Sequence, residues 1–81
     1  MTERAFLFAR IKTKNEQEVL DQLQLMEGVD YAFLLLGKSD LLAKVSAEDA
    51  EILYKQILSK IREIPGLKLT KTFVCKPHSF V

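Results

Sequence analysis

The amino-acid sequence contains an internal repeat, because Gly28 in its first half and Gly66 in its second follow the same apolar pattern. Apolar residues that recur every three or four positions form one face of an amphipathic helix, and glycine suits the left-handed position just after a helix. Each half therefore predicts a helix that ends before its glycine and a strand that follows it. The pairs that superimpose are Val19 and Ile57, Leu20 and Leu58, Leu23 and Ile61, Met26 and Ile64, and Val29 and Leu67.

A strand is also predicted before each helix, and alternation assigns its two faces. The first strand, residues 5–11, carries Phe6, Phe8 and Arg10 on one face and only small or aliphatic residues on the other. The second, from Val29 to Leu36, carries Tyr31, Phe33 and Leu35 on one face. The third runs from Leu41 to Val45. In the last strand, residues 67–75, strict alternation places Thr70, Thr72 and Val74 opposite Leu69, Lys71, Phe73 and Cys75.

A polar break, Gly37-Lys38-Ser39-Asp40, separates the second strand from the third and predicts the tip of a hairpin. Glycine allows a positive φ, and serine and aspartate bond to nearby backbone groups, so the segment is well suited to a simple turn. Two capping boxes predict the helix starts: Thr13 with Glu16, and Ser46 with Asp49.

Joining the two halves through this hairpin predicts one α+β domain over residues 1–81, with the ferredoxin-like order βαββαβ. Both helices would cover one face of a four-stranded antiparallel sheet. Phe6, Phe8 and Arg10 then lie on the other face, and leaving two phenylalanines in water would forgo about 1.5–3 kcal/mol each. We therefore expect a two-fold dimer with facing sheets, a dimeric α/β sandwich; the alternative is that loops half cover these rings.

Length, charge and composition narrow the classes of function that the protein can have. With 81 residues and a net charge of +1, the chain has no general attraction to nucleic acid or to anionic membranes. Cys75 and His78 are its only cysteine and histidine, which predicts no disulfide, no metal site and no cofactor. No apolar run is long enough to span a membrane. We expect a cytoplasmic protein that is not an enzyme, with residues 76–81 as a surface tail.

Several segments, in order, resemble the effector domain of Lrp/AsnC-type transcriptional regulators, also called the RAM (Regulation of Amino acid Metabolism) domain. They are Gly28-Val29, Gly37 to Val45, Ile64-Pro65-Gly66-Leu67 and Thr70-Lys71-Thr72, and the similarity extends from about Arg4 to Cys75. The resemblance implies dimers through facing sheets, rings of four dimers, and small effectors, commonly amino acids, bound where dimers meet. Because the chain starts almost directly at its first strand, we expect a stand-alone domain without a helix-turn-helix and without direct contact to nucleic acid.

The resemblance also implies a ligand site. Gly37, Lys38, Ser39 and Asp40 would line one side of it, and Thr70 and Thr72 would contribute hydroxyls from a neighbouring subunit. A bend that ends in Asp40 offers backbone amides to a carboxylate and a carboxylate to an ammonium group. Leu41 or Tyr31 would form an apolar wall.

Three functions remain open at this point. The first is an amino-acid-sensing and oligomerisation module that alters the assembly of itself or of a full-length Lrp/AsnC regulator. The second is a structural module without a ligand that partners such a regulator. The third is a small dimeric ferredoxin-like enzyme, which would need inward-facing polar groups that the sequence hardly offers.

Overall fold

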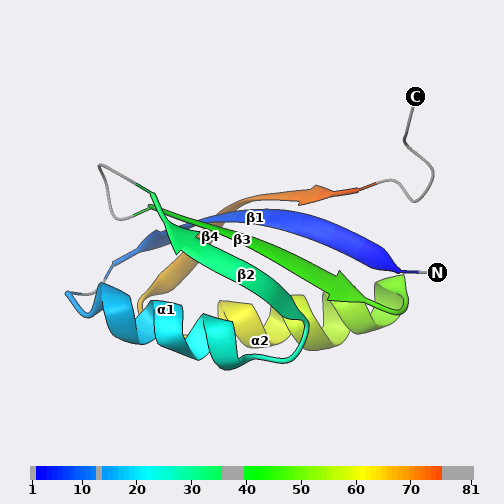
Figure 1. The fold of residues 1–81 in the computed structure, drawn as a ribbon, viewed down its shortest axis with the longest axis horizontal. Coiled ribbons are helices and arrows are strands. Elements are labelled where there is room, and N and C mark those ends of the chain that lie inside the picture. Colours follow the sequence, from blue (N-terminus) through cyan, green and yellow to red (C-terminus); the bar gives the residue numbers. More distant parts are fainter. Residues whose placement is uncertain (1, 13, 36–39, 76–81) are drawn as a thin grey trace.

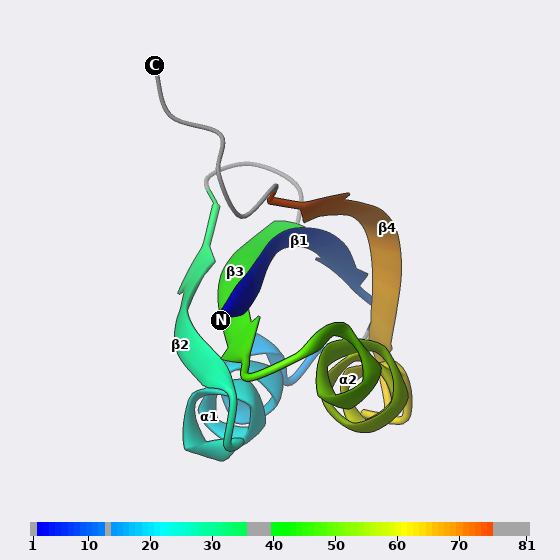
Figure 2. The same ribbon diagram turned by 90° about the vertical axis from the view of Figure 1, so that its right-hand side faces the viewer.

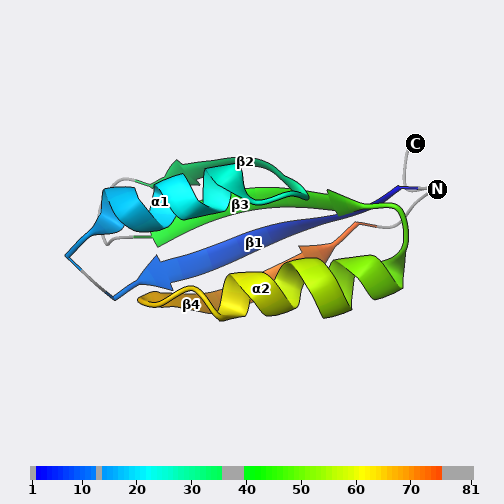
Figure 3. The same ribbon diagram turned by 90° about the horizontal axis from the view of Figure 1, so that it is seen from below.

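The fold is described by a computed structural model that covers residues 2–12, 14–35 and 40–75. Strands β1 (Glu3–Ile11), β2 (Val29–Leu34), β3 (Asp40–Ala47) and β4 (Leu67–Val74) form one sheet in the order β2-β3-β1-β4. All three strand pairings are antiparallel. The helical segments are α1 (Glu16–Leu25), η1 (Ile52–Leu58) and α2 (Ser59–Arg62), and all lie on one face of the sheet (Figure 1, Figure 3). The predicted ferredoxin-like α+β fold is confirmed.

Aliphatic side chains alone make up the buried core of the described residues. The inner face of β1 supplies Ala5, Leu7, Ala9 and Ile11, which were predicted to share a face, and α1 supplies Val19 and Leu23. η1 supplies Leu53, Ile57 and Leu58, and α2 supplies Ile61. Because no aromatic ring is part of this core, the aromatic side chains of the described residues lie elsewhere.

Residues 50–62 form one continuous second helix. Its η1 part is a π-helix, which is wound more widely than an α-helix. In an α-helix Leu58 would point roughly 140° away from Leu53, because successive residues are about 100° apart. Both Ile57 and Leu58 are nevertheless buried with Leu53. A π-helix has more residues per turn, so Ile57 and Leu58 both lie about one turn after Leu53 and on the same side of the helix. The sequence predicted only a helix here.

Both glycines of the internal repeat have the expected left-handed backbone, with φ of 94° at Gly28 and 83° at Gly66. Gly28 is also tightly packed, because a Cβ built on it would lie 2.4 Å from Cδ1 of Ile57. Its carbonyl oxygen accepts a hydrogen bond of 2.8 Å from the amide of Ser46. Gly28 thus lies where the turn after α1, the end of β3 and η1 pack closely together.

Two β-bulges change the faces that simple alternation predicts. Asp30 is the unpaired residue between the pairs Val29–Val45 and Tyr31–Lys44, and Thr70 is the unpaired residue between Leu69 and Lys71. After the second bulge Phe73 pairs with Phe6 on the outer face, whereas Leu69 pairs with Ala9 on the inner face. The prediction that Leu69 and Phe73 share a face is therefore wrong. Figure 2 shows the accompanying bend of β4.

The predicted helix starts need one correction. Ser46 belongs to β3, and its hydroxyl donates a hydrogen bond to the carboxylate of Asp30, so it does not cap the second helix. Asp49 takes that role, because its Oδ1 accepts a hydrogen bond of 2.8 Å from the amide of Ile52. Thr13, the predicted cap of the first helix, lies outside the described residues, and Asn15 occupies the N-cap position of α1.

Candidate functional site

The predicted loop site is described only at its end. Gly37, Lys38 and Ser39 lie outside the described residues, and Asp40 opens β3. The backbone oxygen of Asp40 accepts a hydrogen bond of 2.8 Å from the amide of Leu35, which closes the hairpin. The Asp40 carboxylate lies 3.6 Å from Nε of Arg10, and both side chains are largely exposed. Such an exposed pair contributes little to stability, so the carboxylate remains accessible to other cations.

The two predicted wall residues lie on opposite faces of the sheet. Leu41 is 1% exposed and belongs to the core, so its side chain offers no surface to a ligand, contrary to the predicted role. Tyr31 lies on the outer face, where its ring centroid is 5.2 Å from that of Phe33. Only Tyr31 can therefore contribute an apolar wall outside the core.

The two predicted threonines differ in their surroundings. Thr70 is the bulge residue, and its hydroxyl donates a hydrogen bond of 3.0 Å to the backbone oxygen of Phe8. Thr72 is exposed and pairs with Leu7 on the inner side of the sheet. Because β2 and β4 are opposite edges of the sheet, one chain does not bring these threonines to the hairpin. Their predicted contact with the loop requires a second subunit and stays a prediction.

The outer face of the sheet is aromatic. It gathers four of the five phenylalanines of the chain, and we define it by Phe6, Phe8, Tyr31, Phe33, Leu42 and Phe73. Phe33 and Phe73 are 55% and 50% exposed. The rings of Phe8 and Phe73 meet edge to face with centroids 5.9 Å apart. This face also carries two ion pairs. Lys44 stands between Phe6 and Tyr31 in the sheet, and its Nζ lies 3.6 Å from the Asp30 carboxylate. Arg10 pairs with Asp40.

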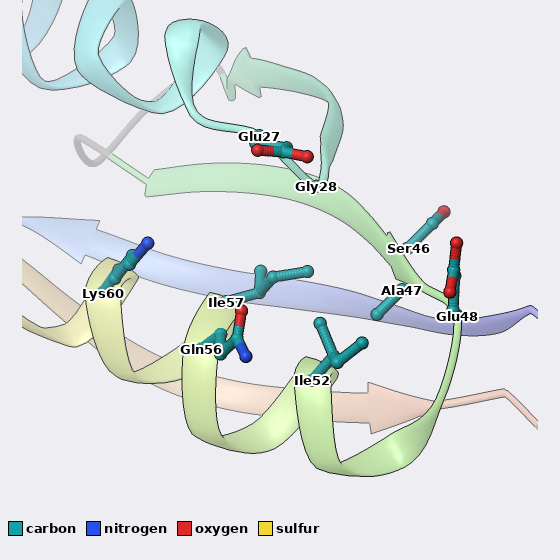
Figure 4. A pocket seen from close by; sticks show the side chains of 9 residues that line it. All are labelled: Glu27, Gly28, Ser46, Ala47, Glu48, Ile52, Gln56, Ile57 and Lys60. Atoms are coloured by element: carbon teal, nitrogen blue, oxygen red, sulfur yellow. The ribbon is translucent and has the colours of Figure 1, made fainter.

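A cleft of about 450 Å³ lies at the other end of the β2–β3 hairpin, and we call it the helix–sheet cleft. It is bounded by the turn after α1, the end of β3 and the side of η1 (Figure 4). Its volume is within the range of small-molecule pockets. The lining residues are Glu27, Gly28, Ser46, Ala47, Glu48, Ile52, Gln56, Ile57 and Lys60.

The sequence does not predict the helix–sheet cleft. Ile52, Gln56 and Lys60 recur at spacings of four, which places them beside the core-facing stripe of the same helix. That spacing is the only local signal, and it is also common on solvent-exposed helix faces. The opposite wall comes from Glu27 and from the end of β3, and no local pattern links them to the helix.

Other kinds of site are not found in the part of the chain that the structure describes. Within residues 2–12, 14–35 and 40–75, no three histidine, cysteine or acidic side chains are placed so that they could hold a metal ion. Among the described helices, none has the length and apolar character that a membrane crossing requires.

The antiparallel sheet, the single layer of helices and the open aromatic face define a small ferredoxin-like α+β domain. Within that class, the sequence profile of the Lrp/AsnC ligand binding domain matches residues 4–76. The chain therefore belongs to the Lrp/AsnC ligand-binding domain family, as the resemblance predicted.

Relatives in sequence are longer proteins. An uncharacterized HTH-type transcriptional regulator of Pyrococcus horikoshii is 39% identical over 59 residues, and one of Pyrococcus furiosus is 37% identical over the same length. Each match covers 73% of this chain and 39% of the relative. The chain thus spans about two fifths of the length of the curated relatives that it matches.

Solved structures agree on the fold. A hypothetical protein of Pyrococcus horikoshii matches with a TM-score of 0.77 and 29% identity, over 94% of this chain and 90% of that one. The structure titled FFRP-DM1 matches with a TM-score of 0.78 and 29% identity, over 94% of this chain and all of that one. AsnC of Escherichia coli matches with a TM-score of 0.79 and 20% identity, over 98% of this chain and 54% of that one, which supports the fold alone.

Proposed function

We propose that this protein is an amino-acid-sensing and oligomerisation module whose state of assembly responds to its ligand. The single observation that carries the proposed oligomerisation is the aromatic outer face of the sheet. The core on the other face contains no aromatic ring among the described residues. Membership in the Lrp/AsnC ligand-binding domain family supports the sensing part.

The outer face supports a two-fold dimer with facing sheets. Burying a phenylalanine side chain is worth about 1.5–3 kcal/mol, so covering Phe33 and Phe73, which are half exposed, would return roughly half of that for each ring. A two-fold axis doubles every such contact, because each subunit presents the same surface. Phe6, Phe8 and Arg10 would lie in this interface, and further contacts between dimers would build the ring of four.

The loop at the tip of the β2–β3 hairpin is the proposed effector site. The exposed carboxylate of Asp40 would accept hydrogen bonds from the ammonium group of an amino acid. Gly37, Lys38 and Ser39 would offer backbone amides to its carboxylate, and Tyr31 would contact its side chain. Thr70 and Thr72 would come from a neighbouring subunit, so the site would be complete only in the assembly.

The proposed action is regulatory rather than catalytic, since the relatives that match are named as HTH-type transcriptional regulators. We propose that the protein acts through its own assembly or through co-assembly with a full-length regulator. Cys75 is a free thiol, which suits the reducing cytoplasm.

A ligand-free structural module is the second candidate, and one observation favours it. Asp40 already faces Arg10 at 3.6 Å, so its carboxylate could serve only to fix the end of the hairpin. In that case assembly would not depend on any amino acid.

Size-exclusion chromatography with light scattering, repeated with each of the common amino acids, separates the two candidates. Under the sensing proposal at least one amino acid changes the mass of the wild-type assembly, and Asp40→Ala abolishes this response. Asp21→Ala is the matched control, because Asp21 is an exposed carboxylate on α1 that pairs with Gln17 and not with the hairpin. An assembly that ignores every amino acid supports the structural module, and a monomeric wild-type protein overturns both.

A further inference from the structure

The helix–sheet cleft is distinct from the proposed effector loop. Asp40 opens β3 and Ala47 ends it, so the loop and the cleft are separated by the whole strand, roughly 20 Å at about 3.3 Å per residue. Residues of one chain suffice to form the cleft, whereas the proposed loop site includes threonines from a neighbouring subunit.

The walls of the cleft are held in place by the backbone. The amide of Ser46 donates to the oxygen of Gly28 at 2.8 Å, which ties the turn after α1 to the end of β3. Gly28 also packs closely on Ile57, because a Cβ at this position would lie 2.4 Å from the Cδ1 atom of Ile57. Ligand sites are usually preformed in this manner, because ordering the walls on binding would cost free energy.

Charged groups of both signs surround an apolar floor. Lys60 and Glu48 lie at opposite ends of the cleft in Figure 4, with Ile57 and Ile52 between them, and Glu27 lies on the wall opposite the helix. Among the described residues, Lys60, Glu48, Glu27 and Gln56 make no ion pair or side-chain hydrogen bond. By contrast, Lys55 on the same helix pairs with Glu51 at 3.6 Å.

The π-helical winding of η1 is an independent indication of a binding site. π-helical turns are rare and are frequently found at functional sites. Here the π-helix η1 contributes Ile52, Gln56 and Ile57 to the cleft, directly ahead of Lys60. The irregular segment and the lining of the cleft therefore coincide.

We propose that the helix–sheet cleft binds a small aliphatic zwitterion that carries a carboxylate at one end and an ammonium group at the other. The ammonium of Lys60 and the amide of Gln56 bind the carboxylate. Glu48 binds the ammonium group, and the methylene chain lies on Ile52 and Ile57.

The probe is 6-aminohexanoate, and the readout is the spectrum of protein labelled at the isoleucine δ1-methyl groups. The chain has five isoleucines, so the cleft residues Ile52 and Ile57 can be compared with buried Ile11 and Ile61 in one experiment. We expect saturable shifts of the Ile52 and Ile57 methyls, with Ile11 and Ile61 unchanged. Hexanoate and hexylamine, which each lack one charge, should bind at least about tenfold more weakly, since a lost charged contact is worth 1.4 kcal/mol or more.

Substitutions in the cleft test which charged side chains bind the two ends of the ligand. Lys60→Gln and Glu48→Gln should each weaken binding of 6-aminohexanoate about tenfold or more, whereas Lys55→Gln, on the same helix but outside the cleft, should leave the affinity unchanged. The proposal is overturned if the methyl shifts are absent up to roughly 10 mM, where a millimolar ligand is mostly bound. Equal binding of hexanoate, or unchanged binding to Lys60→Gln, also overturns it. None of these outcomes bears on the effector loop, which the light-scattering experiment tests separately.

Discussion

Substitution of Gly28 by alanine tests the packing that joins the turn after α1 to the second helix. Gly28 has a φ of 94°, and an alanine Cβ there would lie 2.4 Å from Cδ1 and 2.9 Å from Cγ1 of Ile57, and 3.3 Å from the backbone oxygen of Ser46. A left-handed backbone costs an L-residue about 1–2 kcal/mol. Overpacking a tight site adds about 1–3 kcal/mol.

The expected loss for Gly28→Ala is therefore about 2–5 kcal/mol of the free energy of unfolding. For a domain of this size each kcal/mol lowers the Tm by about 4–8 °C, so the Tm should fall by roughly 8–40 °C. Urea and thermal denaturation at one fixed protein concentration measure both quantities, because the stability of an oligomer depends on concentration.

Two controls separate backbone strain from the clash. Gly66→Ala replaces a glycine with a φ of 83° and should cost only the strain, about 1–2 kcal/mol. In an Ile57→Val background, which lacks the Cδ1 atom, Gly28→Ala should cost about 1 kcal/mol less than in the wild type. Equal costs in the two backgrounds would refute the clash, and a cost below about 1 kcal/mol for Gly28→Ala would refute the whole argument.

Three further predictions concern the outer face, the bulge and a helix start. Phe33→Ser combined with Phe73→Ser should lower the mass in light scattering to that of one chain, whereas Tyr54→Ser, on an exposed part of the second helix, should not. Thr70→Val should cost about 0.5–1.5 kcal/mol in urea denaturation, because it removes the hydroxyl that bonds across the bulge; no loss would mean that this bond does not hold the bulge. Asp49→Ala should cost about 1 kcal/mol in the same assay, through loss of the cap, and Asp49→Asn should recover most of it.

The sequence by itself determined the elements and their order. Apolar residues at helical spacing, alternation in the strands, and glycines at positions 28 and 66 are local signals, and each acts within a few residues along the chain. The inner and outer faces of β1 follow from the same local rule, because β1 has no unpaired residue opposite β3. The fold class and the aromatic outer face could therefore be predicted without coordinates.

Only the tertiary structure decided the features that depend on contacts between distant segments. A bulge exists only relative to a partner strand, so the extra residues Asp30 and Thr70, and the change of face at Phe73, could not be read from one strand alone. Ser46 bonds to Asp30, sixteen residues away, instead of to the helix that follows it. The helix–sheet cleft likewise requires Glu27, Glu48 and Lys60 to be brought together from three elements, and only the packing of the helices on the sheet does that.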